Sequence, residues 1–241
     1  MLKLTKTYDV CLTGEPKLTV VFLHGIAADT SSFEGLLAHL LREASMKEMR
    51  MVAFDWLGAG KSYTSDELNY DYKEQLEALK NSINTLDVKG PLILVAHSMG
   101  TMLATRFATE NQRLVKGLVL VSAPVYKKED IEKPLFEKSM EGFSEVVGRK
   151  SKGLLESKAF NNEIKNIVSD VHNYDYLVGL KQPTTIIYGE LDKIIAPFNY
   201  PGLLKANPNL IAQKTPGSHG VTIDKYGKIS TAIKGFMKEE A

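Results

Sequence analysis

The chain has 241 residues, 44% of them hydrophobic and 24% charged, which suffices for one substantial core in a single domain spanning residues 1–241. Its formal charge of +1 lacks the basic excess typical of nucleic-acid-binding proteins. No apolar run approaches the roughly 20 residues that span a bilayer, and the start lacks the apolar core of a secretory signal. The single Cys11 excludes an internal disulfide. We therefore expect a cytoplasmic protein that binds neither nucleic acid nor membranes.

Five short apolar runs alternate with amphipathic stretches along the chain. Because these runs are apolar on both faces, they predict parallel strands covered by helices on each side. The alternation predicts a mostly parallel, doubly wound α/β sheet built from right-handed crossovers. The expected strands span residues 19–23, 49–54, 92–96, 117–121 and 184–188, and the expected helices include residues 31–45, capped by Ser31 or Ser32, and residues 72–86.

One stretch interrupts this alternation. Residues 124–182 contain no strong strand candidate, and apolar residues recur near helical spacing from Ile131 to Val147 and from Ile164 to Val171. We interpret the stretch as a small helical cap inserted between two strands of the sheet. Ordinary core helices would produce the same spacing, so this alternative stays open.

The strongest chemical motif follows the predicted strand at residues 92–96. This strand runs directly into Ser98, and a helical pattern begins at Met99, so the serine stands on a tight strand-to-helix turn. Such a turn requires small residues two positions before and two positions after the serine. Ala96 and Gly100 meet this requirement, although glycine is commoner at the first position. The turn predicts that Ser98 is a nucleophile rather than a serine that merely caps a helix.

An enzyme that transfers acyl groups needs backbone N–H groups aimed at the oxyanion that develops on its substrate. One donor is expected at Met99, immediately after the nucleophile. The other is expected on the loop that leaves the first strand through Gly25, where we choose Ile26. His24 in the same loop is expected to hold the loop by hydrogen bonds, without a direct part in catalysis.

A glycine-rich stretch from Asp55 to Ser62 superficially suggests nucleotide binding. The phosphate loop would require glycine at position 55, and the dinucleotide motif would require glycine in place of Tyr63. Both motifs therefore fail, and we predict a tight turn in which the Asp55 carboxylate accepts hydrogen bonds from backbone N–H groups. No histidine or cysteine cluster has metal-site spacing, so neither a cofactor nor a metal is expected.

The His24-Gly25 pair, the Asp55–Ser62 stretch and the serine turn at Ser98 together resemble the α/β-hydrolase superfamily in order and spacing. The resemblance extends over residues 2–238. It implies an acid after a later strand and a histidine near the C-terminus. Relatives that open epoxides or remove halides use an aspartate nucleophile, which position 98 lacks.

The resemblance also implies the partners of Ser98. Of the five histidines, His219 alone lies beyond the last predicted strand, and it would serve as general base. Asp192 stands at the superfamily's offset for the acid and would orient the imidazole, with Glu190 as the local competitor. His97, although adjacent to the nucleophile in sequence, is expected to point elsewhere.

The expected activity is that of a carboxylesterase-type serine hydrolase, which cleaves a small-molecule ester through an acyl-enzyme. Apolar side chains of the helical insertion would line its pocket, which favours small to medium apolar acyl groups. Three alternatives stay open. They are carbon–carbon bond hydrolysis of ketone intermediates, acyl transfer or perhydrolysis by the same residues, and a ligand receptor with residual hydrolysis.

Overall fold

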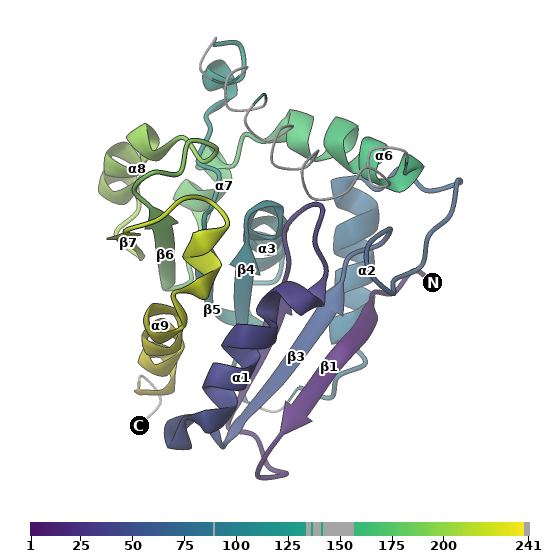
Figure 1. Cartoon of the computed structure of the whole chain (residues 1–241), viewed down its shortest axis with the longest axis vertical. Coiled ribbons are helices and arrows are strands. Elements are labelled where there is room, and N and C mark those ends of the chain that lie inside the picture. The colour runs from purple at the N-terminus through teal and green to yellow at the C-terminus, as the bar shows by residue number, and fades with distance from the viewer. Residues whose placement is uncertain (89, 134–135, 137–140, 142–156, 239–241) are drawn as a thin grey trace.

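A computed structural model describes residues 1–88, 90–133, 136, 141 and 157–238 of the chain (Figure 1). The described residues form a seven-stranded sheet in the order β1-β3-β2-β4-β5-β6-β7. All neighbouring strands pair in parallel except β1, which runs antiparallel to β3 at one edge. The predicted mostly parallel α/β sheet is thus confirmed. The strands are β1 (Thr5–Cys11), β2 (Leu18–Leu23), β3 (Met49–Asp55), β4 (Leu92–His97), β5 (Val115–Val121), β6 (Thr184–Gly189) and β7 (Leu210–Thr215).

Helices cover both faces of this sheet (Figure 1). Successive residues of a strand point to opposite faces, so Val20 and Phe22 of β2 pack in the cluster with α1 and α9. Val21 and Leu23 pack in the second cluster, with α2 and α3. Burial of each such side chain stabilises the fold by about 1.5–3 kcal/mol. The helices are α1 (Glu34–Arg42), α2 (Tyr72–Ile83), α3 (Met99–Glu110), α8 (Tyr200–Ala206) and α9 (Tyr226–Lys238).

The sequence pattern does not predict the two edge strands, β1 and β7. Each lies at one end of the strand order, so part of its surface faces solvent and its sequence lacks a continuous apolar run. In β7, Ile211 is 61% exposed.

The predicted helix at residues 31–45 is also shorter in the structure. It is a 3₁₀ turn, η1 (Thr30–Phe33), followed by α1. The expected cap at Ser31 or Ser32 is wrong, because the Asp29 carboxylate accepts the hydrogen bond from the Ser31 N–H, at 2.8 Å. Asp29 caps better here because its carboxylate reaches the N–H two residues ahead.

The described part of residues 124–182 lies between β5 and β6 and is helical. It contains the helices α6 (Lys158–Asn166) and α7 (Tyr174–Gly179) and the 3₁₀ turns η3 (Lys128–Asp130) and η4 (Val168–Asp170). In Figure 1, α6 crosses above α2, beyond the end of the sheet to which the parallel strands point. Five apolar positions of the predicted helical pattern lie outside the described residues, namely Leu135, Met140, Phe143, Val146 and Val147.

Polar side chains on one face of α6 attach this helix to the loop before α2. Lys158 Nζ donates to the carbonyl of Asp66 at 2.8 Å, and Asn166 Nδ2 donates to that of Asn69 at 2.6 Å. Donors spaced by whole turns share one face of a helix, so this face is docked along its length. Within the described residues, no helix is both long and apolar enough to cross a membrane.

Candidate active site

Ser98 stands between the last residue of β4 and the first residue of α3. Its backbone has φ 52° and ψ −122°, in a region that residues with a Cβ rarely adopt. The Ser98 N–H donates to the carbonyl of Val121 at 2.9 Å, so the end of β5 holds the turn. This local strain turns the chain sharply from strand to helix and leaves the serine at the carboxyl edge of the sheet.

Two glycines allow this turn to fit against β2. A Cβ on Gly100 would lie 2.4 Å from the carbonyl oxygen of His24, so a side chain there would prevent α3 from approaching the strand. A Cβ on Gly25 would lie 3.0 Å from the Cβ of Ser98. The loop that carries Ile26 therefore passes directly beside the serine.

His219 and Asp192 lie next to Ser98 in the structure. The Nε2 atom of His219 lies 2.8 Å from Ser98 Oγ, and its Nδ1 atom lies 2.8 Å from Asp192 Oδ2. The Asp192 side chain is completely buried, and its Oδ1 accepts a hydrogen bond from the Ile194 N–H at 3.0 Å. Because an ionised carboxylate only accepts, Nδ1 carries the imidazole proton and Nε2 is free to accept the Ser98 proton.

The structure brings these three residues together although they are far apart in sequence. Ser98 follows β4, Asp192 follows β6, and His219 follows β7, and these strands end at the same edge because they are parallel. The competing acid, Glu190, is 42% exposed, and its Oε2 lies 3.8 Å from Lys214 Nζ. Asp192 is therefore the carboxylate that contacts His219.

The expectation for His97 is wrong. Its ring centroid lies 5.3 Å from that of His219, and its Nε2 lies 3.4 Å from the backbone carbonyl oxygen of His219. The sequence pattern missed this contact because His97 is the last residue of β4, and the loop that carries His219 folds back over that end. Among the described residues, Ser122 is another neighbour of His219 that no motif indicated, and its Oγ donates to the same oxygen at 3.2 Å.

The two residues expected to hold an oxyanion belong to backbone segments next to Ser98. Met99 is the first residue of α3, where helix geometry leaves backbone N–H groups without a carbonyl partner in the helix. The same helix end favours negative charge. Ile26 follows Gly25, where a Cβ would lie 3.0 Å from the Cβ of Ser98. Both backbone segments therefore adjoin Ser98.

His24 connects the loops that follow β2 and β3. Its Nε2 accepts a hydrogen bond from the Trp56 N–H at 3.0 Å, and its Nδ1 donates to the Gly25 carbonyl at 2.8 Å. The Trp56 indole donates to the His24 carbonyl at 2.9 Å. Complete burial lowers the pKa of His24, which keeps the imidazole neutral in these contacts. The predicted hydrogen-bonding role of His24 in the loop is confirmed.

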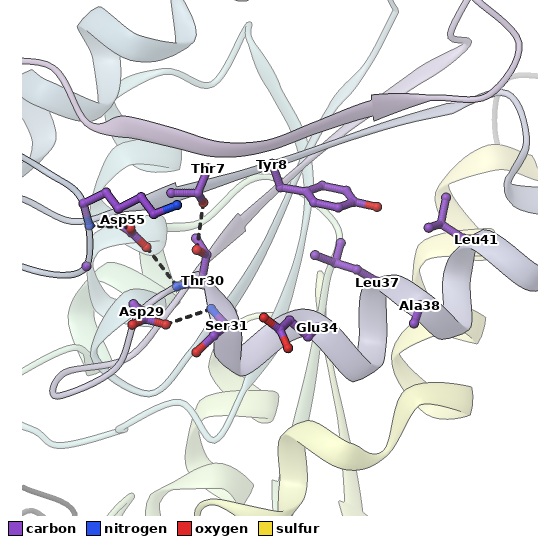
Figure 2. A pocket seen from close by; sticks show the side chains of 12 residues that line it. Thr7, Tyr8, Asp29, Thr30, Ser31, Glu34, Leu37, Ala38, Leu41 and Asp55 are labelled. Carbon is purple, nitrogen blue, oxygen red and sulfur yellow. Dashed lines mark hydrogen bonds between the residues drawn. The ribbon is translucent and has the colours of Figure 1, made fainter.

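Asp55 fixes the glycine-rich turn after β3. Its Oδ1 accepts from the Thr30 N–H at 2.9 Å, and its Oδ2 accepts from the Lys61 N–H at 2.8 Å (Figure 2). A Cβ on Gly60 would lie 2.2 Å from Oδ2, so the carboxylate fills the space that a side chain would need. The predicted turn, with Asp55 accepting from backbone N–H groups, is confirmed.

An open cavity of about 570 Å³ lies beside this turn, between β1 and α1 (Figure 2). Ser98, Asp192 and His219 are not among its lining residues. Polar groups in it bond one another, as Thr7 Oγ1 does with Thr30 Oγ1 at 2.7 Å. The cavity is therefore separate from the serine site.

Curated proteins similar to this chain include two whose names are those of lipid hydrolases. The chain is 30% identical over 108 residues to the probable lysophospholipase BODYGUARD 2 of Arabidopsis thaliana, over 45% of this chain and 23% of that protein. It is 31% identical over 115 residues to the sn-1-specific diacylglycerol lipase ABHD11 of Danio rerio, over 48% of this chain and 34% of that protein. The match thus spans only 23% to 34% of the length of these two relatives.

Solved structures match over nearly the whole chain. A thermophilic esterase from Thermogutta terrifontis has a TM-score of 0.68 at 20% identity, covering 99% of this chain and 98% of that one. The esterase EaEST from Exiguobacterium antarcticum has a TM-score of 0.67 at 19% identity, covering 99% and 100%. At sequence identities this low, the similarity establishes the fold alone. The sequence model of the α/β hydrolase fold matches residues 19–163, more than half of the chain, and the chain therefore belongs to the α/β hydrolase family.

Proposed function

We propose that this protein is a serine hydrolase that cleaves carboxylic esters through an acyl-enzyme. The observation that carries the proposal is the continuous hydrogen-bonded series of Ser98, His219 and Asp192, with both distances at 2.8 Å. These distances lie within the range needed for proton transfer between a nucleophile and its base. The buried acid orients the base, which completes the arrangement of roles that acyl transfer requires.

In the proposed reaction, Ser98 Oγ attacks the ester carbonyl carbon while His219 Nε2 takes its proton. The N–H groups of Ile26 and Met99 donate to the resulting oxyanion, an interaction whose loss typically slows such reactions by roughly 10²–10³-fold. The intermediate collapses, and His219 returns the proton to the departing alkoxide. Water then attacks the acyl-enzyme with His219 again as base, which releases the carboxylic acid and restores Ser98. Asp192 stabilises the imidazolium in both steps.

We propose that the substrates are small-molecule esters with small to medium apolar acyl groups. Apolar residues follow the strands at the edge where Ser98 lies, among them Leu57 after β3, Val125 after β5 and Ile194 after β6. We further propose that residues 124–182 form a helical cap over this edge, within the single domain. The position of α6 beyond this edge of the sheet supports that role (Figure 1).

An ester panel and an active-site label test this proposal together. The panel contains p-nitrophenyl esters from acetyl to palmitoyl, lysophosphatidylcholine and a diacylglycerol, because two relatives bear the names of lipid hydrolases. We expect fastest hydrolysis of the shorter acyl esters and labelling of Ser98 by a fluorophosphonate. Preference for the lipid substrates would contradict the proposed acyl range and leave the mechanism intact.

The Ser98→Ala variant is the matched control for the same assays. It should be unlabelled and inactive while keeping the unfolding temperature of the wild type, because alanine removes only the hydroxyl. If the wild type neither turns over an ester nor reacts with the label, the hydrolase proposal is wrong. If Ser98→Ala still turns over, the assigned nucleophile is wrong.

A further inference from the structure

Ser122, directly after β5, has an unusual backbone for a residue with a side chain. Its φ is 53°, and the residue is completely buried. The Ser122 N–H donates to the carbonyl of Ile187 in β6 at 2.8 Å, so neighbouring strands hold the backbone in place. Glycine adopts positive φ without steric cost, whereas serine does not. The serine at this strained position therefore points to a use for its hydroxyl.

That hydroxyl contacts the main chain of His219. Ser122 Oγ donates to the His219 carbonyl oxygen at 3.2 Å, and His97 Nε2 lies 3.4 Å from the same atom. A carbonyl oxygen has two lone pairs and can accept from both groups. The residues that supply these contacts follow or end central strands, so they are fixed to the sheet.

The loop that carries His219 needs such a contact. Gly217 precedes the histidine with φ 133°, and Gly220 follows it with no atom within 4 Å of the position of a Cβ. Glycines on both sides leave this stretch of main chain with more conformational freedom than other residues would allow. The Leu191 N–H donates to the Gly217 carbonyl at 3.1 Å, and the ring and the carbonyl of His219 make the contacts described above.

We propose that Ser122 is a positioning residue that holds the main chain of His219, so that the imidazole stays between Ser98 and Asp192. The inference rests on the proposed function, since it concerns the base of that reaction. During turnover the hydrogen-bond partner of His219 Nε2 changes from Ser98 to the leaving group and then to water. The contact from Ser122 is to the backbone, so it persists through every one of these steps.

Two substitutions distinguish a role of Ser122 in positioning His219 from a role in folding. Ser122→Ala removes the hydroxyl and keeps the strained φ, whereas Ser122→Gly removes the hydroxyl and relieves the strain. We expect kcat to fall about 10-fold in both variants with KM unchanged, because a misplaced base slows the chemistry without weakening substrate binding. The unfolding temperature of Ser122→Gly should not fall below that of the wild type. The low-field proton NMR signal of His219 Nδ1–H should broaden or shift in both.

A buried serine far from the site gives the control. Ser82 in α2 accepts a hydrogen bond from the Leu4 N–H at 2.8 Å, and Ser82→Ala should lower the unfolding temperature without changing kcat. Fluorophosphonate labelling of wild-type Ser98 tests the proposed function separately. If Ser98 is labelled while Ser122→Gly keeps the kcat and the Nδ1–H signal of the wild type, the positioning role is refuted and the hydrolase proposal stands. If wild-type Ser98 is not labelled, the hydrolase proposal is wrong, and so is the positioning role that rests on it.

Discussion

Glu163 of α6 is a buried carboxyl group at the contact between α6 and the body of the protein. The residue is 5% exposed, and its Oε1 accepts a hydrogen bond from Gln75 Nε2 at 3.1 Å. Gln75 in turn bonds both the N–H and the carbonyl of Leu57, at 3.0 and 3.1 Å. Burial raises the pKa of Glu163 from 4.5 to about 8, because the charged form would lose its hydration.

The raised pKa makes the free energy of unfolding depend on pH. The folded protein keeps a proton on Glu163 that the unfolded chain releases above a pKa of 4.5. The resulting stability is fully present below pH 4.5 and is lost as the pH rises through about 8. At about 1.4 kcal/mol per pH unit, the whole interval corresponds to about 5 kcal/mol, of which about 3 kcal/mol is lost by pH 7.

The Glu163→Gln variant tests this reasoning, because glutamine keeps the shape and the oxygen that accepts from Gln75 but does not ionise. Urea unfolding should be measured for both proteins from about pH 5 to about pH 9. We expect the variant to gain about 4 kcal/mol over the wild type between about pH 5 and pH 8, and no more above that range. Glu67→Gln, at an exposed site, should track the wild type throughout. A difference between Glu163→Gln and the wild type that does not change with pH would refute the reasoning.

Three other substitutions have definite expected outcomes. Gly100→Ala should lower the free energy of unfolding in urea by roughly 3 kcal/mol, because its Cβ would meet the His24 carbonyl at 2.4 Å; wild-type stability would contradict the close approach of α3. Asp192→Asn should lower kcat on the best ester by about 10³–10⁴-fold without loss of folding, because asparagine favours the wrong imidazole tautomer. A decrease in kcat of less than about tenfold would exclude Asp192 as the orienting acid. Arg106→Met should lower the free energy of unfolding by about 2 kcal/mol. Arg106 Nη2 lies 3.2 Å from Asp170 Oδ2, and its guanidinium stacks on the rings of Tyr72 and Tyr176. An unchanged unfolding midpoint in urea would show that this ion pair contributes nothing.

Local sequence was sufficient for the central strands and for the turn at Ser98. Residues 92–96 are apolar on both faces, which only a strand covered by helices on each side can bury. Gly100 is needed within two residues of the serine, so its signal is local as well. The positions of Asp192 and His219 followed from the resemblance to a family, because no local pattern links a late loop histidine to a serine more than one hundred residues earlier.

The edge strands and the environment of His219 were not visible in the pattern. The strands β1 and β7 expose part of their surface, so their sequences lack the apolar signal of the central strands. His97 and Ser122 carry polar side chains at the ends of strands, and nothing nearby in sequence indicates which backbone carbonyl they will meet. That carbonyl comes from a loop that arrives about one hundred residues later.

The sequence by itself determined the succession of central strands and helices along the chain and the strained turn that presents Ser98. Both follow from the periodicity of apolar residues and the size of side chains, which act over a few residues. Only the tertiary structure decided which polar groups are buried and what they contact. It buried Glu163 of α6 against Gln75 of α2, where its pKa rises, and it placed the Ser122 hydroxyl against the main chain of His219. Burial and hydrogen bonding of a polar group depend on every segment that packs against it, and those segments come from distant parts of the chain.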